Sequence, residues 1–295
     1  MPRVTVLDGG TGRELARIGA PFIQPLWSAQ ALIEGPDYVA RVHESYIAAG
    51  AQVVTTNTYA LVPFHLGQEL YEREGVRLTR LAASIAREVA DRHPGVRVAG
   101  CLPPVLCSYQ PELFVREAAR PLLDVLVREQ APFVDLWLAE TQSSIVEAEL
   151  IREVIDTHGQ TSPLWLSFTL DDEFAGAAPR LRSGESILDA AKAAERLGAD
   201  VLLFNCSQPE VMESAVALAA GAIDLPIGVY ANAFVTDNEE SGANAGIHDI
   251  RADVTPAAYL ELARRWLAAG ATLVGGCCGI GPEHISALSA DLSAG

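Results

Sequence analysis

Basic residues are scarce in this sequence of 295 residues. Lys and Arg number 21 against 38 Asp and Glu, so the formal net charge is −17 at pH 7. No run of Lys and Arg interrupts this acidic excess. Because binding to a phosphate backbone depends on clustered basic residues, we expect no nucleic-acid partner.

Long apolar runs and a cleavable leader are also missing. The apolar runs end well short of the roughly 20 residues that a membrane-spanning helix needs. The first residues, MPRVTVLDGGTGRE, contain neither the apolar segment nor the small-residue cleavage site of a secretory signal. We therefore expect no membrane partner and a location in the cytoplasm.

The number of cysteines is odd, which argues against a disulfide framework. Such frameworks are typical of small secreted domains rather than of chains of this length. We therefore expect reduced thiols, available for metal binding or nucleophilic chemistry. The five cysteines are Cys101, Cys107, Cys206, Cys277 and Cys278.

Short apolar segments alternate with longer amphipathic segments along the chain. This alternation is typical of buried parallel strands joined by helical crossovers. The expected strands are residues 4–7, 52–56, 96–101, 133–139, 164–168, 201–205, 227–230 and 272–275. The expected helices include residues 37–49, 69–91, 113–129, 143–157, 186–197, 209–220, 256–269 and 285–292. This inventory predicts a (β/α)8 TIM barrel, an α/β fold in a single domain of residues 1–295, with a doubly wound open sheet as the alternative.

Two long polar or proline-rich segments follow expected strands. They are residues 103–112 and residues 231–254, which include His248. In a barrel both would lie at the C-terminal ends of the strands, where long loops commonly form lids or binding elements. We expect both to border a binding site.

Three cysteines follow strands whose ends would meet over one barrel mouth. Cys206 follows the expected strand 201–205, and Cys277 and Cys278 follow the strand 272–275. Three thiolates would supply three ligands of a tetrahedral zinc ion and leave one position open, which is the arrangement of a catalytic site. Adjacent residues of a regular strand point to opposite faces, so the flanking glycines 275, 276 and 279 would permit the necessary turn.

Other interpretations of the cysteines remain open at this point. Cys206 alone could be a small buried apolar residue. Cys277 and Cys278 could form a strained vicinal disulfide, or the thiols could be redox-active without a metal. Cys101 and Cys107 lack glycine flanks, and we expect them to be core or loop thiols.

Several short motifs accompany the cysteines. They are DGGTG at 8–12, WS at 27–28, TNTY at 56–59, ET at 140–141, SF at 167–168, SGES at 183–186, NC at 205–206 and GGCCG at 275–279. With these motifs the chain resembles the homocysteine S-methyltransferases over nearly its whole length. The resemblance implies a (β/α)8 barrel with zinc as cofactor, in which homocysteine binds zinc through its thiolate and accepts a methyl group to give methionine.

The resemblance also implies roles for individual residues. Cys206, Cys277 and Cys278 would be the zinc ligands. The amino-acid end of homocysteine would be held by the backbone at Asp8 and Gly9 and by the carboxylate of Glu140.

Asn57 and Asn205 are further candidates for substrate contact. From the residues alone, Asn57 could equally support its loop, Asp8 could cap the turn after the first strand, and Glu140 could favour a helix dipole at a helix start. Glu185 is expected to support a helix start, and His43 is expected to pack within its helix.

The methyl donor is predicted less directly, because two loops depart from the family pattern. After the third strand the chain reads CLPPVLCSY instead of a GPYG-like run, and after the seventh it reads YANAF instead of YPNSG. With 295 residues, we expect none of the additional domains carried by family members that use methylcobalamin or methyltetrahydrofolate. We therefore expect a small sulfonium, with S-methylmethionine or S-adenosylmethionine favoured and betaine or another ammonium donor next.

Two alternative functions follow from the same residues. One is a zinc- or amino-acid-binding sensor without turnover, and the other is a methyltransferase for a related thiol or selenol. In each case the expected partners are small molecules.

Overall fold

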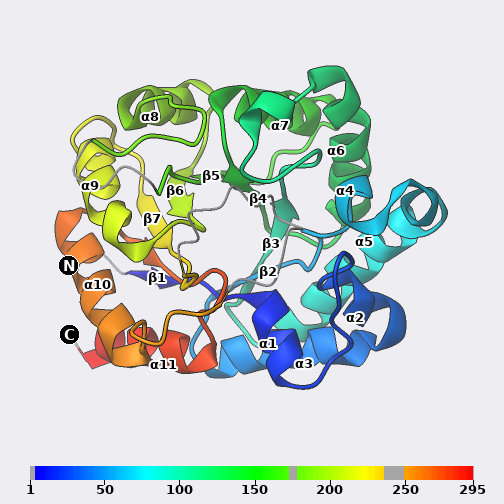
Figure 1. Cartoon of the computed structure of the whole chain (residues 1–295), viewed down its shortest axis with the longest axis horizontal. Coiled ribbons are helices and arrows are strands. Elements are labelled where there is room, and N and C mark those ends of the chain that lie inside the picture. The colour runs from blue at the N-terminus through cyan, green and yellow to red at the C-terminus, as the bar shows by residue number, and fades with distance from the viewer. Residues whose placement is uncertain (1–3, 173–177, 236–248, 295) are drawn as a thin grey trace.

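Eight parallel strands form a closed barrel inside a ring of helices (Figure 1). The computed structural model describes residues 4–172, 178–235 and 249–294. The sheet order is β1-β8-β7-β6-β5-β4-β3-β2, and a parallel bridge between Leu7 and Val53 joins its two ends. The TIM barrel predicted from the sequence is confirmed. The strands are β1 (Thr5–Val6), β2 (Val53–Thr55), β3 (Arg97–Leu102), β4 (Leu136–Gln142), β5 (Leu164–Phe168), β6 (Val201–Asn205), β7 (Ile227–Tyr230) and β8 (Leu273–Val274).

The ring consists of the crossover helices together with short helices at the barrel mouth. The crossover helices are α3 (Pro36–Ala48), α5 (Gln68–Ala90), α6 (Arg116–Gln130), α7 (Ile145–Thr157), α8 (Ile187–Arg196), α9 (Pro209–Ala220) and α10 (Pro256–Ala269), and α11 (Pro282–Ala294) follows the last strand. These correspond to the eight helices expected from the sequence. The short helices were not expected: α1 (Thr11–Arg17), α2 (Ala29–Glu34), α4 (Pro63–Leu66) and the 3₁₀ helix η1 (Pro111–Leu113).

The strands are buried on both faces, which explains their continuous apolar sequences. Leu138 of β4 and Leu203 of β6 belong to a cluster that fills the barrel. Trp137 and Phe204, their neighbours in the sequence, belong to the larger cluster between the sheet and the helices. Residues on both faces of the strands are therefore used for packing.

Strand β4 differs from its expected limits, residues 133–139. It begins at Leu136 and continues through Gln142, which pairs with Phe168 of β5 after a shift in register beyond Ala139. The prediction followed the apolar run and ended where the polar residues begin. Glu140 consequently lies inside a strand, and its alternative interpretation as a residue at a helix start is wrong.

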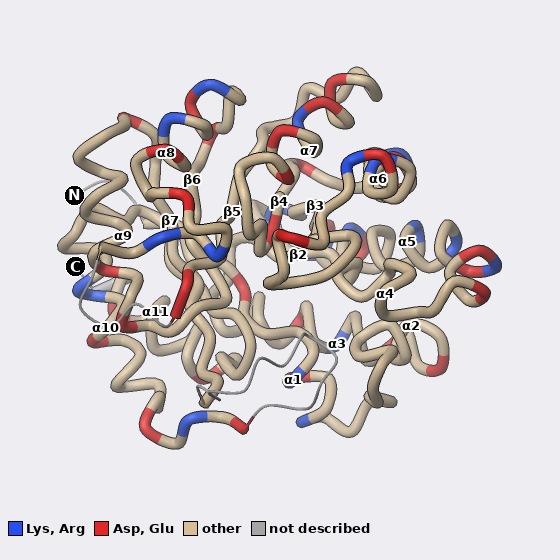
Figure 2. The backbone as a smooth tube through the Cα atoms, turned by 45° about the horizontal axis from the view of Figure 1, so that its top comes forward, with Lys and Arg blue, Asp and Glu red and all other residues tan. Residues whose placement is uncertain are grey.

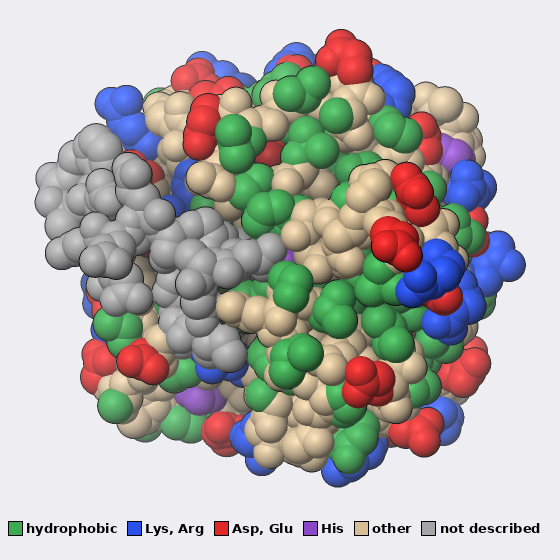
Figure 3. All heavy atoms as spheres, turned by 45° about the vertical axis from the view of Figure 1, so that its right-hand side comes forward, with side chains coloured by type: hydrophobic (Ala, Val, Ile, Leu, Met, Phe, Trp, Pro, Cys, Tyr) green, Lys and Arg blue, Asp and Glu red, His purple; other side chains and the backbone are tan. Residues whose placement is uncertain are grey.

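Charged residues lie mainly on the outer helices (Figure 2). On the face shown in Figure 3, acidic and basic side chains lie next to one another. Exposed ion pairs such as Arg196–Glu149, at 2.9 Å, occur on these helices and contribute little to stability individually. Among the residues described, no helix combines the length and apolar character needed to cross a membrane.

Candidate metal centre and active site

A pocket of about 570 Å³ opens at the C-terminal ends of the strands. This is the end at which TIM-barrel enzymes carry their active sites. Its lining includes four groups of residues that matter for the chemistry. They are the three cysteines Cys206, Cys277 and Cys278, the carboxylates Asp8, Glu140 and Asp172, the cations Arg13 and Arg182, and the aromatic residues Phe22, Trp27, Tyr59, Tyr109, Tyr230 and Phe234.

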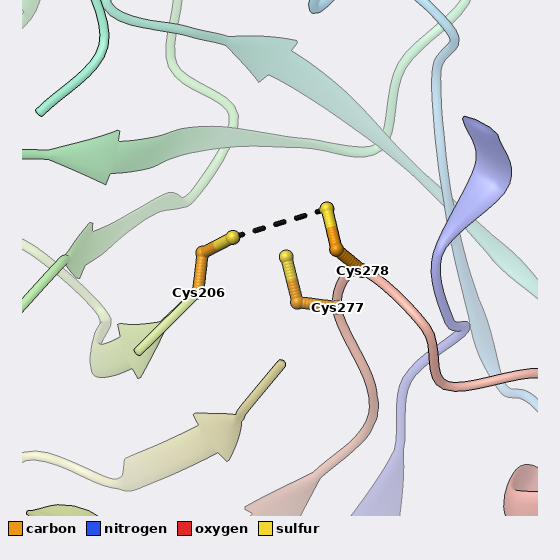
Figure 4. A group of neighbouring side chains, drawn as sticks. All are labelled: Cys206, Cys277 and Cys278. Carbon is orange, nitrogen blue, oxygen red and sulfur yellow. Dashed lines mark hydrogen bonds between the residues drawn. The ribbon is translucent and has the colours of Figure 1, made fainter. Parts of the chain in front are cut away.

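The three cysteines converge at this pocket. Cys206 follows β6, Cys277 and Cys278 lie in the turn after β8, and their side chains point toward one another (Figure 4). All three Sγ atoms lie within 4.8 Å of one another, and the Cys206 and Cys278 sulfurs are 4.0 Å apart. The chain therefore brings together sulfurs that are 72 residues apart in the sequence.

This separation fits a shared metal ion. Metal–sulfur bonds of about 2.3 Å at tetrahedral angles would place the sulfurs about 3.8 Å apart. Thiols of Cys277 and Cys278 and the Tyr109 hydroxyl hydrogen-bond to the Cys206 sulfur, which lowers the pKa of Cys206 well below its usual range. The same interaction with Cys206 raises the pKa of Cys277 and of Cys278. Only a cation would allow all three to be thiolates at once.

The backbone turns sharply on both sides of this cluster, as the glycine flanks predicted. Gly279 has φ +84°, in the left-handed region that glycine adopts without strain. Cys206 itself has φ +49°, which is unusual for a residue with a side chain. These turns direct the three sulfurs to one point.

Asp8 and Gly9 border the pocket directly after β1. The Asp8 carboxylate accepts hydrogen bonds from the backbone N–H of Thr55, at 2.7 Å, and from its hydroxyl, at 3.1 Å. The side chain thus ties β1 to β2 instead of capping its own turn. Burial raises the pKa of Asp8 to about 7 despite these bonds. A Cβ on Gly9 would lie 2.4 Å from the Ile280 carbonyl oxygen, so only glycine fits here.

Glu140 also borders the pocket, close to a thiol outside the cluster of three. The Cys101 thiol, fully buried in β3, donates to the Glu140 carboxylate at 3.3 Å. Burial raises the pKa of Glu140 to about 7, and the hydrogen bond from Cys101 opposes this shift. Cys101 is a core thiol, as expected, but it contacts the candidate site.

The two asparagines occupy different positions. Asn57 lies in the pocket lining, and its amide donates to the Ser28 carbonyl oxygen at 3.1 Å. Asn205 is fully buried behind the lining, where it hydrogen-bonds to Thr141 and Ser167. The structure therefore brings Asp8, Gly9, Asn57 and Glu140 to the pocket surface, but not Asn205.

The remaining residues singled out from the sequence lie at helix starts, within a helix and in an expected loop. The side chain of Glu185 accepts the backbone N–H of Ile145, at 2.9 Å, at the start of the neighbouring helix α7. Ser186 caps α8. His43 packs fully buried in α3. Of the expected loop 231–254, residues 236–248, including His248, lie outside the described residues.

Strained backbone is concentrated at the pocket. Four residues other than glycine have positive φ, and all of them line it. Such conformations typically cost on the order of 1–3 kcal/mol each and persist where the surroundings fix them. Sequence reasoning did not identify this feature. The residues, among those described, are Trp27 (+49°), Tyr109 (+68°), Thr141 (+61°) and Cys206 (+49°).

Sequence reasoning also missed an ion pair at the pocket. Arg182 Nη2 and Asp172 Oδ2 lie 2.7 Å apart, and both residues line the pocket. The only signal in the sequence is that Asp172 closely follows the expected strand 164–168. Residues in the connection after that strand must lie at the same barrel mouth.

Comparisons with known proteins agree with this geometry. The profile described as "Homocysteine S-methyltransferase" matches residues 5–292. The chain belongs to the homocysteine S-methyltransferase family. It is accordingly a methyltransferase, and the resemblance inferred from its motifs is confirmed.

Individual members of the homocysteine S-methyltransferase family match this chain over almost its whole length. Homocysteine S-methyltransferase 1 of Arabidopsis thaliana is 29% identical, over 97% of this chain and 93% of the relative. Selenocysteine methyltransferase of Astragalus bisulcatus is 26% identical, over 99% of this chain and 94% of the relative. The metallated form of the homocysteine methyltransferase MmuM from Escherichia coli superimposes with a TM-score of 0.78 at 26% identity, covering 98% of this chain and 96% of that chain.

Proposed function

We propose that this protein is a zinc-dependent methyltransferase that transfers a methyl group from a small sulfonium donor to the thiol of homocysteine. The observation that carries the proposal is the convergence of three Sγ atoms within 4.8 Å in a pocket that also contains two buried carboxylates. The single barrel, residues 1–295, would carry the whole activity. The five cysteines are free thiols, which supports the proposed cytoplasmic location.

Cys206, Cys277 and Cys278 would hold the metal. Three thiolates match the preference of zinc for sulfur ligands, and metallated MmuM supports a metal in this fold. When bound, zinc would deprotonate an incoming thiol, so that no protein base is needed for that proton.

Asp8, Gly9 and Glu140 would hold the amino-acid end of homocysteine. Glu140 offers a carboxylate to the substrate ammonium, and the backbone at Gly9 approaches the pocket without a side chain in the way. An ammonium beside Glu140 would favour its ionised form, which burial otherwise disfavours. Asn57 would complete this wall of the site.

The reaction would be an in-line displacement. The homocysteine sulfur forms a bond to the methyl carbon while the bond from that carbon to the donor sulfonium breaks. The donor keeps the electron pair and leaves as a neutral thioether. Fixed positions for sulfur and methyl supply much of the acceleration in such a transfer.

A panel of methyl donors with homocysteine tests the proposal. Purified protein is incubated with deuterated-methyl S-methylmethionine, S-adenosylmethionine or betaine, and labelled methionine is measured by mass spectrometry. We expect labelled methionine with a sulfonium donor, and none after Cys206→Ser. Retained metal and homocysteine binding without product from any donor would instead indicate a sensor.

A selenol acceptor is a second candidate, supported by the similarity to the selenocysteine methyltransferase of Astragalus bisulcatus. A selenolate is a softer nucleophile that suits the same metal centre. Adding selenocysteine and selenohomocysteine to the acceptor panel tests it by the ratio of kcat/KM values. A ratio that favours the selenol would make it the principal acceptor.

A further inference from the structure

The Arg182–Asp172 ion pair lies on the pocket wall in the connection between β5 and α8. The side chains are 24% and 13% exposed, so both are largely withdrawn from water. The Arg182 guanidinium lies over the Tyr109 ring, 4.7 Å from its centre, and the Tyr109 hydroxyl is 3.0 Å from the Cys206 sulfur. A single aromatic ring therefore separates the ion pair from the metal-ligating cluster.

The two side chains keep unused hydrogen-bonding capacity. Arg182 Nε donates to the Thr169 hydroxyl at 3.3 Å and Nη2 donates to Asp172, whereas Nη1 has no partner among the residues that the structure describes. Asp172 accepts from Arg182 through Oδ2 and from the backbone N–H of Gln208 through Oδ1, at 2.8 Å. A carboxylate oxygen can accept more than one hydrogen bond. A donor for an incoming carboxylate thus lies beside an acceptor for an incoming ammonium.

The depth of the pair in the pocket distinguishes it from the homocysteine site. Asp8 follows β1 directly and Glu140 lies within β4, whereas Asp172 lies beyond the end of β5, in the loop above it. In an in-line transfer the sulfur of the donor lies on the opposite side of the methyl carbon from the acceptor sulfur. An acceptor held by Asp8 and Glu140 next to the strand ends would leave the donor on the side of the pocket lined by Asp172 and Arg182.

We propose that Arg182 and Asp172 determine donor specificity by binding the carboxylate and ammonium of an α-amino-acid head group on the sulfonium donor. The inference rests on the proposed function. Arg182 presents the N–H groups of Nη1 to the carboxylate, and Asp172 presents its oxygens to the ammonium. Donors that carry this head group, such as S-methylmethionine and S-adenosylmethionine, are selected over betaine and over simple sulfonium ions.

The test combines truncation of the donor with variants of the protein. Values of kcat/KM are measured for S-methylmethionine, for its analogue without the carboxylate, (3-aminopropyl)dimethylsulfonium, and for trimethylsulfonium. In the parent protein, loss of the donor carboxylate should reduce kcat/KM about tenfold or more, as expected for a charge-assisted hydrogen bond. In Arg182→Gln that reduction should disappear, because the partner of the carboxylate is already missing. In Asp172→Asn, the kcat/KM advantage of (3-aminopropyl)dimethylsulfonium, which carries the ammonium, over trimethylsulfonium, which lacks it, should become smaller.

Two controls separate specificity from structure. Arg196→Gln breaks an exposed ion pair of the neighbouring helix α8 and should leave every donor ratio unchanged. The KM for homocysteine of Arg182→Gln should match that of the parent. An equal loss with all three donors would show that the pair only ties the ends of its loop together, and would overturn the proposal.

Failure of the proposed function can be distinguished from failure of this inference. If the parent transfers a methyl group from no donor, binding of S-methylmethionine is measured by calorimetry without homocysteine. Binding that weakens about tenfold or more in Arg182→Gln would still support the head-group site. Equal binding by parent and variant would overturn it. If the parent shows the same kcat/KM with and without the donor carboxylate, the head-group site is overturned. The methyltransferase proposal would remain intact.

Discussion

Asn205 and Thr141 are joined by two reciprocal hydrogen bonds. The backbone N–H of Thr141 donates to Asn205 Oδ1 at 3.0 Å, and Asn205 Nδ2 donates to the Thr141 hydroxyl at 2.8 Å. Thr141 follows Glu140, and Asn205 precedes Cys206. The pair therefore fixes the Glu140 carboxylate, the proposed partner of the substrate ammonium, relative to Cys206, a proposed metal ligand. It also holds Thr141 in its left-handed conformation.

Asn205→Ala should destabilise the protein and weaken metal retention. The substitution leaves the Thr141 and Ser167 groups that bond to Asn205 without partners in a buried region. Each buried unsatisfied group costs about 1–3 kcal/mol. We expect a loss of several kcal/mol in urea unfolding and faster metal loss to a chelator. Ser167→Ala, which removes only one of these bonds, should cost about 1 kcal/mol. Equal effects would contradict a special role for Asn205.

Replacing Cys206, Cys277 or Cys278 by Ser should abolish metal retention. A serine hydroxyl is not deprotonated as readily as a thiol and is a poor zinc ligand, so the site would be left with two thiolates. We expect about one zinc ion per chain in the parent, by elemental mass spectrometry, and close to none in each variant. Cys107→Ser is the matched control, because that thiol hydrogen-bonds to Gln110 at 2.7 Å and does not belong to the cluster. Full zinc content in any ligand variant would refute the assignment.

The fold could be predicted because its signal is repeated along the whole chain. The predicted first and last residues of β5 and β6 agree with the structure, because the apolar runs end there at polar residues or turns. The short helices were missed because segments such as α2 and α4, of six and four residues, contain too little periodicity. In β4, polar residues continue the strand through pairing with β5, which the sequence of one strand cannot reveal.

The candidate site could be predicted only in part, for a related reason. The cysteines were found because barrel topology alone brings the ends of β6 and β8 to one mouth. The ion pair of Arg182 and Asp172 depends on how one loop folds back, and the contact of Cys101 with Glu140 depends on the register between β3 and β4. The buried position of Asn205 follows from side-chain hydrogen bonds, which motif comparison does not specify.

Glu140→Gln should raise the KM for homocysteine without removing the metal. The amide is similar in shape and still accepts a hydrogen bond from Cys101, but it no longer offers a negative charge to the ammonium. Loss of a charged hydrogen bond of about 1.5–3 kcal/mol corresponds to a rise of roughly ten- to a hundredfold in KM. Steady-state kinetics and zinc content measure the two effects. A variant with normal KM, or one that loses its zinc, would contradict a role confined to the substrate.

His43 should make the protein less stable as the pH falls from neutral. Its side chain is fully buried in α3, and neither ring nitrogen has a hydrogen-bond partner among the described residues. Burial lowers its pKa from 6.5 to about 4. Above pH 6.5 the ring is neutral in the folded and unfolded states alike and contributes nothing. Between these pKa values His43 is protonated in the unfolded chain but not in the folded chain. The free energy of unfolding therefore falls as the pH falls.

The size of this effect follows from the shift in pKa. By linkage, about 2 kcal/mol of stability should be lost by pH 5 and about 3 kcal/mol in total near pH 4, below which both states are protonated. Buried Asp8 and Glu140, whose pKa values are raised, act in the opposite direction, so the parent alone does not isolate His43. The measurement is therefore the difference between the parent and His43→Phe in urea unfolding at neutral pH and at about pH 5. The variant should lose about 2 kcal/mol less than the parent over this interval, and identical losses would exclude a neutral buried imidazole.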